Sequence, residues 1–120
     1  MGYNETETLE GLKSWRKKGL SAECKREIEK GFEHNGYRFD CYTTDQLNYN
    51  SMLNLTSEDD SDTVDCDVDL IDTGARVTIQ MNHSEILAMS KAAAAHIYQL
   101  RSRLKVAKLS VDEATAPHRS

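Results

Sequence analysis

The sequence predicts an α+β fold with helices at both ends and two β-hairpins between them. The hairpin prediction rests on the Asn35-Gly36 pair and on a hydrophobic period of two over residues 64–81. A long C-terminal helix is predicted because apolar residues recur at spacings of three and four from about residue 83 to 108. The single proline, Pro117, leaves the helices free to run without interruption.

Two short helices are predicted before the first hairpin. The first covers residues 8–19 and ends at Gly19, because glycine is a weak helix former. It is amphipathic, with a basic back and an apolar face of Leu9, Leu12 and Trp15. The second begins at Ser21, which fits an N-cap, buries Ile28 and stops at Gly31.

The first hairpin is predicted over residues 32–41. Both central residues of a type I′ turn need a positive φ, which Asn35 and Gly36 tolerate. A short helix follows over residues 43–55, where Thr43 and Gln46 have the spacing of a capping box. Residues 56–63 are a polar, acidic loop.

The second hairpin is predicted over residues 64–81. Its first strand alternates apolar residues with Asp65, Asp67 and Asp69, so one face is buried and the other carries a row of carboxylates. Asn82 is the predicted N-cap of the long helix, with Glu85 at its third position. Five apolar residues on one side of this helix form a seam like that of a coiled coil: Ile86, Ala93, Ile97, Leu100 and Leu104.

A chain of 120 residues is expected to form one domain, with residues 1–7 and 114–120 frayed at its ends. No run of about 18 apolar residues predicts a membrane span, and the acidic N-terminus does not resemble a secretory signal. Three cysteines without CxxC spacing are expected to be reduced and mostly buried, because they fit neither a disulfide framework nor a zinc site.

The charge distribution is uneven. Between Phe39 and Ala75 there are ten acidic side chains and no Lys or Arg, whereas the rest of the chain is net basic. A nucleic-acid-binding protein is expected to have a coherent basic face, so this class is disfavoured. The pattern favours docking onto a partner of opposite charge.

The segment Leu70-Ile71-Asp72-Thr73-Gly74-Ala75 matches the catalytic loop of retroviral-type aspartic proteases. Such enzymes need two of these loops, so that two carboxylates share a proton, on a mostly β scaffold with a glycine-rich flap. The chain has no glycine-rich flap and places a long helix after this hairpin. We therefore interpret the motif as a turn in which Gly74 takes the left-handed conformation.

No metal, cofactor or catalytic residue is predicted. The acidic stretch fails the EF-hand pattern, because a loop that starts at Asp65 lacks the glycine at position 6 and has Arg76 at position 12. Weak cation binding by residues 58–62 remains an alternative. The four histidines have no metal-ligand spacing, and His96 is expected to be a packed or interfacial residue.

The stretch from Lys25 to Asn50 resembles a small domain of unknown function found in bacteriophage tail-fibre and tail-associated proteins. The resemblance is carried, in order, by Gly31-Phe32, Asn35-Gly36, Phe39-Asp40, Gln46, Val77-Thr78-Ile79-Gln80, Ile86-Leu87 and Ala95-His96. It covers roughly residues 12–115. The resemblance implies a location in the virion tail after synthesis in the host cytoplasm, and it implies no catalytic residue.

The expected function is that of a non-enzymatic tail adaptor, associated with a fibre, the baseplate or the tail tip. Other tail proteins are the expected partners, with a possible homo-oligomer through the C-terminal helix and no nucleic acid or membrane. Two alternatives stay open: a tail-fibre assembly chaperone absent from the virion, and an acidic inhibitor of a host nucleic-acid enzyme. The hypothetical interface consists of the helix seam and the carboxylate row: Ile86, Ala93, Ile97, Leu100, Leu104, Asp65, Asp67 and Asp69.

Overall fold

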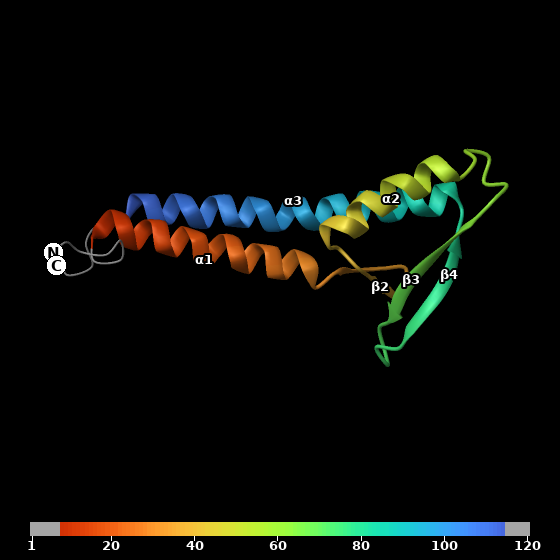
Figure 1. The fold of residues 1–120 in the computed structure, drawn as a ribbon, viewed down its shortest axis with the longest axis horizontal. Helices are drawn as coiled ribbons and strands as arrows, with labels where there is room; N and C mark the ends of the chain where they lie inside the picture. The colour runs from red at the N-terminus through yellow and green to blue at the C-terminus, as the bar shows by residue number, and fades with distance from the viewer. Residues whose placement is uncertain (1–7, 115–120) are drawn as a thin grey trace. The chain divides into compact units, whose positions relative to one another are not determined.

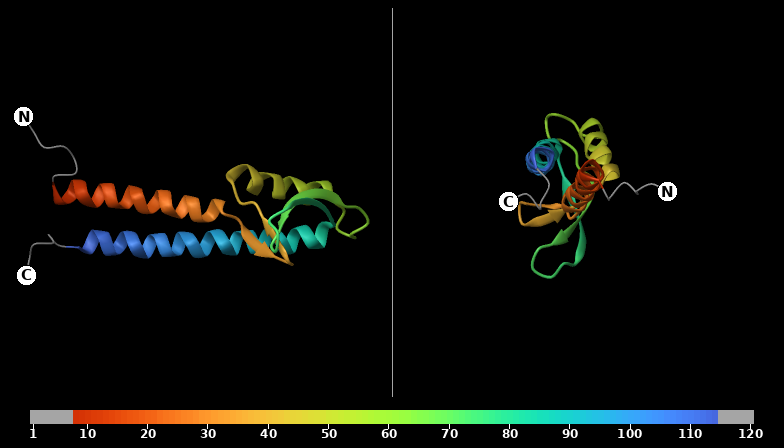
Figure 2. Two further views of the ribbon diagram at one scale, coloured as in Figure 1. Left: turned by 90° about the horizontal axis from the view of Figure 1, so that it is seen from below. Right: turned by 90° about the vertical axis from the view of Figure 1, so that its left-hand side faces the viewer.

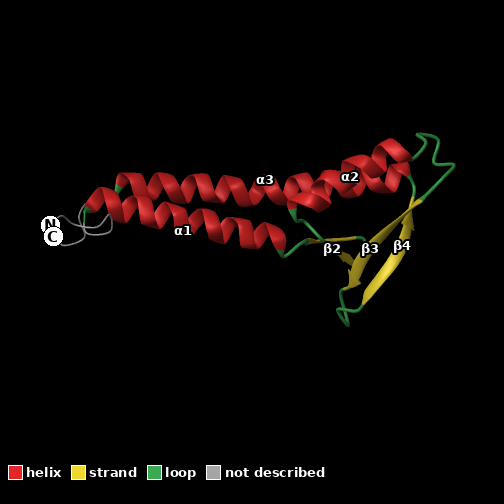
Figure 3. Cartoon of the chain, viewed as in Figure 1, coloured by secondary structure: helices red, strands yellow, loops and turns green. Residues whose placement is uncertain are grey.

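A computed structural model describes residues 8–114, and its α+β arrangement confirms the predicted fold class (Figures 1 and 3). Residues 1–7 and 115–120, which carry most of the predicted frayed ends, lie outside the described part. The elements in chain order are α1 Leu9–Glu29, β1 Phe32–His34, β2 Tyr37–Phe39, α2 Thr43–Leu55, β3 Val64–Leu70, β4 Arg76–Met81 and α3 His83–Glu113.

The described chain divides into two compact units. The helical unit contains residues 8–27 of the N-terminal segment and residues 99–114 of the C-terminal segment. The sheet unit contains residues 28–98. By sequence, the helical unit has ten Lys and Arg against five Asp and Glu, and the sheet unit has four against thirteen. The two units therefore have opposite net charges.

Both predicted hairpins are confirmed, and in the sheet unit they join into one antiparallel sheet with the strand order β1-β2-β3-β4. Strands β3 and β4 pair along their length, from Val64 opposite Met81 to Asp69 opposite Arg76. Strand β2 pairs with β3 only at two positions near the end of β3. Residues 64–68 of β3 therefore have no pairing partner in β2 on that side.

The turns follow the residues that prefer a positive φ. Asn35 and Gly36 have φ values of 51° and 84°, as a type I′ turn requires. Gly74 has a φ of 72° in the connection between β3 and β4. Gly31 stops α1 as predicted, with a φ of 85°.

The core of the sheet unit lies where the sheet meets α2 and the first part of α3. The Phe32 and Phe39 rings stack with centroids 5.6 Å apart, and both side chains are buried. Met89 of α3 is fully buried as well. His96 is packed as predicted: its ring lies 5.8 Å from that of Phe32, and its Nε2 is 3.2 Å from the Ile28 carbonyl oxygen.

In the helical unit, residues 9–27 of α1 run beside residues 99–113 of α3, as the views in Figures 1 and 2 agree. The two predicted N-terminal helices are one continuous helix, so the predicted break at Gly19 is wrong. A glycine inside a helix costs about 1 kcal/mol, which packing along a neighbouring helix outweighs. The Cys24 thiol, 3.6 Å from the Leu100 carbonyl oxygen, belongs to this packing.

The predicted orientation of the N-terminal helix is also wrong. Leu12 and Trp15 are 42% and 64% exposed, whereas Ser14, Lys17 and Ser21 on the other side are half-buried. Residues spaced by three shift by about 60° around a helix at each step, so Leu9, Leu12 and Trp15 spread over a wide part of its surface. Their spacing therefore does not determine which side of the helix is buried.

The helix caps agree with the sequence in α3 and differ in α2. The Asn82 side chain accepts a hydrogen bond from the Glu85 N–H at 2.9 Å, and the Glu85 carboxylate accepts one from the Asn82 N–H at 3.0 Å. This is the predicted capping box. In α2 the cap is Tyr42, one residue earlier than the predicted cap Thr43, and the Asp45 carboxylate accepts a hydrogen bond from the N–H of Tyr42 at 2.9 Å.

The acidic loop over residues 56–63 is held against the start of α3. The Asp60 carboxylate accepts hydrogen bonds from the N–H and the hydroxyl of Ser84, at 2.8 and 2.7 Å. These bonds hold the pKa of Asp60 below its usual value of 3.8. A carboxylate at a helix N-terminus also interacts favourably with the helix dipole. The loop thus adds a second cap to α3.

Candidate docking surfaces

The carboxylate row predicted on β3 lies on the exposed face of the sheet. Asp65 and Asp67 are exposed, and Asp69 is half-buried. The Thr78 hydroxyl, across the strand pair, donates a 2.6 Å hydrogen bond to Asp67. The row is therefore a real surface feature, and its members differ in how much charge they present to a partner.

Arg76 neutralises one end of this row. Its guanidinium donates hydrogen bonds to Asp69 at 3.1 Å and to both carboxylate oxygens of Asp40. These bonds raise the pKa of Arg76, so it remains charged. Sequence reasoning missed the network, because Asp40 reaches the row only through the pairing of β2 with β3. The uncompensated negative charge of the row therefore lies at Asp65 and Asp67.

Beside the row there is an open groove of about 570 Å³ within the sheet unit. Strands β3 and β4 supply one wall, and α2 supplies the other with both acidic and apolar side chains. Leu55 is 70% exposed at this groove. Six of the lining residues show its mixed chemistry: Asp40, Asp45, Met52, Leu55, Asp65 and Asp67. An acidic groove with an apolar wall suits a partner segment that carries both basic and apolar residues.

The groups buried beneath the groove are not suited to nucleophilic chemistry. Burial raises the pKa of the Cys41 and Cys66 thiols to about 11, so both remain protonated at neutral pH. Burial also raises the pKa of Tyr49, whose hydroxyl donates a 2.6 Å hydrogen bond to the Asp40 carbonyl. All three cysteines are free, as predicted.

The Asp72-Thr73-Gly74-Ala75 segment forms the connection of the second hairpin, as predicted. The Gly74 N–H donates to the Leu70 carbonyl at 2.8 Å, and the Leu70 N–H donates to the Ala75 carbonyl at 2.9 Å. Asp72 is exposed in this turn. Among residues 8–114, no three His, Cys, Asp or Glu side chains are grouped so that they could hold a metal ion.

The predicted helix seam is not a uniform surface. Ile86 is 0% exposed and Ala93 is 5% exposed, so the core of the sheet unit takes up both side chains. Both residues belong to the core and leave no exposed surface area for a partner. Ile97, Leu100 and Leu104 are half-buried. The exposed apolar side chains of α3 belong to residues outside this seam.

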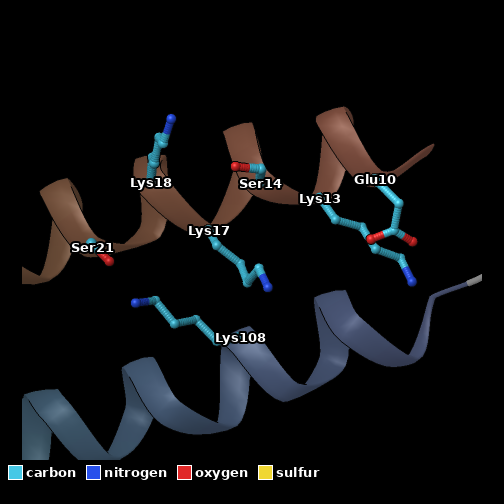
Figure 4. Close-up of a pocket in the computed structure, with 7 residues that line it drawn as sticks. All are labelled: Glu10, Lys13, Ser14, Lys17, Lys18, Ser21 and Lys108. Atoms are coloured by element: carbon cyan, nitrogen blue, oxygen red, sulfur yellow. The ribbon is translucent and has the colours of Figure 1, made fainter. Parts of the chain in front are cut away.

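The helical unit has a lysine-rich pocket of about 380 Å³ between α1 and α3. Figure 4 shows Lys17 and Lys108 extending into the space between the helices, and Lys18 pointing away from it. The Lys17 ammonium forms a 2.7 Å ion pair with Asp112, and the Lys13 ammonium donates to the Asp112 carbonyl at 2.8 Å. These contacts join the two helices at this end of the unit.

The ion pair gives a test of the helix pairing. The hydrogen bond from Lys17 holds the pKa of Asp112 below its usual value of 3.8. A lowered pKa adds stability that is fully present above the unfolded-state pKa and is lost as the pH falls below about 3.8. We expect an NMR titration to give a low pKa for Asp112 and Lys17→Gln to raise it. Lys105→Gln is the control and should leave it unchanged; an unchanged pKa in Lys17→Gln would contradict the pairing.

Comparison with known protein families matches residues 12–118 to a domain of unknown function, DUF4376. The chain belongs to this family. Searches of curated proteins and of solved structures gave no match. Within the described residues, no helix is long and apolar enough to cross a membrane.

Proposed function

We propose that the chain is a non-enzymatic structural adaptor of a bacteriophage tail, which works through protein–protein contacts. The observation that supports docking most directly is the groove of the sheet unit. It combines the exposed carboxylates of Asp65 and Asp67 with the exposed apolar side chain of Leu55. Surfaces that mix apolar area with oriented charge are typical of partner binding.

The assignment to a tail rests on the sequence resemblance described above. In this proposal the groove receives a basic segment of another tail protein of the fibre, the baseplate or the tail tip. The nucleic-acid-mimic alternative has less support, because Arg76 offsets the charge of Asp40 and Asp69. The chaperone alternative uses the same groove and differs in whether the chain remains in the finished particle.

Mass spectrometry of purified particles tests the proposal. We expect the chain at a fixed copy number relative to the fibre or baseplate proteins. Its absence from finished particles that carry fibres would favour the chaperone alternative. A location of the gene away from any tail genes would contradict a tail function of either kind.

A charge variant tests the groove itself. Asp65→Asn combined with Asp67→Asn should lower incorporation into particles at least tenfold, because two uncompensated charges are lost from the docking surface. A control with the same charge change elsewhere is Glu58→Gln combined with Asp72→Asn. Equal incorporation of both double variants would remove the groove from the proposal.

A further inference from the structure

Strand β3 has an open edge on the side that faces β2. The Leu70 N–H donates a hydrogen bond to the Ala75 carbonyl, so Leu70 and every second residue before it direct their backbone groups toward β4. The N–H and C=O groups of Asp65 and Asp67 therefore point away from β4, to the side where β2 pairs at only two positions. Within residues 8–114 these groups have no backbone hydrogen-bond partner, and the Asp67 carbonyl has only a long contact of 3.9 Å with the Cys66 thiol.

The edge is open because the chain leaves the sheet after β2. The antiparallel register, with Arg38 opposite Asp69, would place Asp40 opposite Asp67 if the strand continued. The Asp40 carbonyl instead accepts a 2.6 Å hydrogen bond from the Tyr49 hydroxyl of α2. The chain then turns into α2, and no later segment of the described chain returns to this edge.

An extended segment added at this edge would place its side chains in two different surroundings. Residues opposite Asp65 and Asp67 would share their face of the sheet, where both carboxylates are exposed. Residues between them would point to the opposite face, toward α2. On that side Cys66 lines the groove together with Met52 and Leu55. The edge therefore suits a segment in which basic residues alternate with apolar ones.

We propose that β3 binds such a segment of a basic partner as an added strand. The open stretch, residues 64–68, is about 17 Å long at about 3.4 Å per residue, which accommodates about five residues of the partner. In strand addition the backbone hydrogen bonds supply affinity, and the alternate side chains supply specificity. The inference rests on the proposed function in taking the groove as the docking site, and it adds how the partner segment is bound and what pattern its sequence has.

Charge excludes a second copy of the same edge as the occupant. Two paired β3 edges would bring Asp65 and Asp67 of one copy against those of the other, and like charges across a strand pair are destabilising. Charged residues on an edge strand are one way in which proteins prevent this kind of self-pairing. A basic segment reverses the sign of the same interaction, so the two carboxylates favour it and oppose an acidic or identical strand.

A short synthetic peptide tests strand addition directly. The probe is Val-Lys-Val-Lys-Val with capped ends and a fluorescent label, and anisotropy measures its binding to the full chain. When its lysines pair with Asp65 and Asp67, their N–H groups face β3, whereas the valine N–H groups face away. N-methylation of both lysines should therefore weaken binding by about tenfold or more, because the backbone hydrogen bonds are lost. N-methylation of the central and last valines is the control and should leave binding unchanged.

Amide hydrogen exchange locates the bound peptide. Saturating peptide should slow the exchange of the Asp65 and Asp67 amides by about tenfold or more, because both acquire a hydrogen-bond acceptor. The Cys66 amide already faces β4, opposite Ile79, and is the internal control.

Variants of the chain test the two side-chain contacts. Asp65→Asn combined with Asp67→Asn should weaken peptide binding, and so should Leu55→Ser. Leu47→Ser, at a 63% exposed apolar residue of α2, is the matched control and should bind like the unmodified chain. Circular dichroism confirms that each variant is folded.

The outcomes separate this inference from the proposed function. Equal binding of the two N-methylated peptides would overturn strand addition and leave the groove as a docking site of another kind. Failure of the unmodified peptide to bind, or unchanged exchange at Asp65 and Asp67, would also overturn it and would show that the edge carboxylates only prevent pairing. The composition of the particles tests the tail function independently of all these results.

Discussion

The substitution Gly31→Ala should destabilise the chain by about 2–5 kcal/mol, from left-handed strain and from overpacking. Gly31 has a φ of 85°, and a methyl group there would lie 2.3 Å from the Phe39 carbonyl oxygen. That oxygen belongs to the backbone of β2, so the strand itself would have to move. Because β2 links the first hairpin to β3, the disturbance should spread through the sheet unit.

Gly36→Ala is the matched control. Gly36 has almost the same φ, 84°, but a methyl group there would meet nothing within 4 Å. Only the conformational strain remains, which is about 1–2 kcal/mol. Urea denaturation followed by circular dichroism measures both losses. Equal losses would show that the close approach of the Phe39 carbonyl oxygen at Gly31 adds nothing to the loss of stability.

The correctly predicted elements have signals that are local in the sequence. Asn35-Gly36 specifies its turn because both residues tolerate a positive φ, and the alternation over residues 64–81 specifies which side of the hairpin is buried. The capping box from Asn82 to Glu85 is complete within four residues. None of these features depends on a distant part of the chain, so the local sequence is sufficient to predict them.

The incorrect predictions concern elements that depend on distant residues. Gly19 does not end α1, because residues 99–113 of α3 lie beside this helix and stabilise it. The same packing decides that Ser14 and Lys17, rather than Leu12 and Trp15, face the neighbouring helix. No local pattern in α1 contains this information.

The candidate docking surfaces also combine features that the local sequence predicts with features that depend on distant residues. The carboxylate row follows directly from alternation along β3 and was predicted residue by residue. The pairing of Arg76 with Asp40 and Asp69 was not, since it depends on the register that joins two hairpins. The groove also needs α2 as its second wall. The sequence therefore predicts the carboxylate row but not the groove beside it.

The substitution Ile86→Ala should destabilise the sheet unit by about 2–5 kcal/mol, the usual cost of removing a fully buried branched side chain. Ile86 is 0% exposed and has no outward surface. Leu87→Ala, at the next residue of α3, removes a side chain that is 41% exposed and should cost much less. Thermal and urea denaturation of both variants compare the two positions.

Sedimentation of the folded Ile86→Ala variant separates a core role of this residue from a docking role. Ile86→Ala should lower stability while the sedimentation behaviour of the folded chain stays that of the unmodified protein. Ile86 then acts in the core of the sheet unit and not in docking. A loss of assembly in folded Ile86→Ala would assign docking to the seam instead.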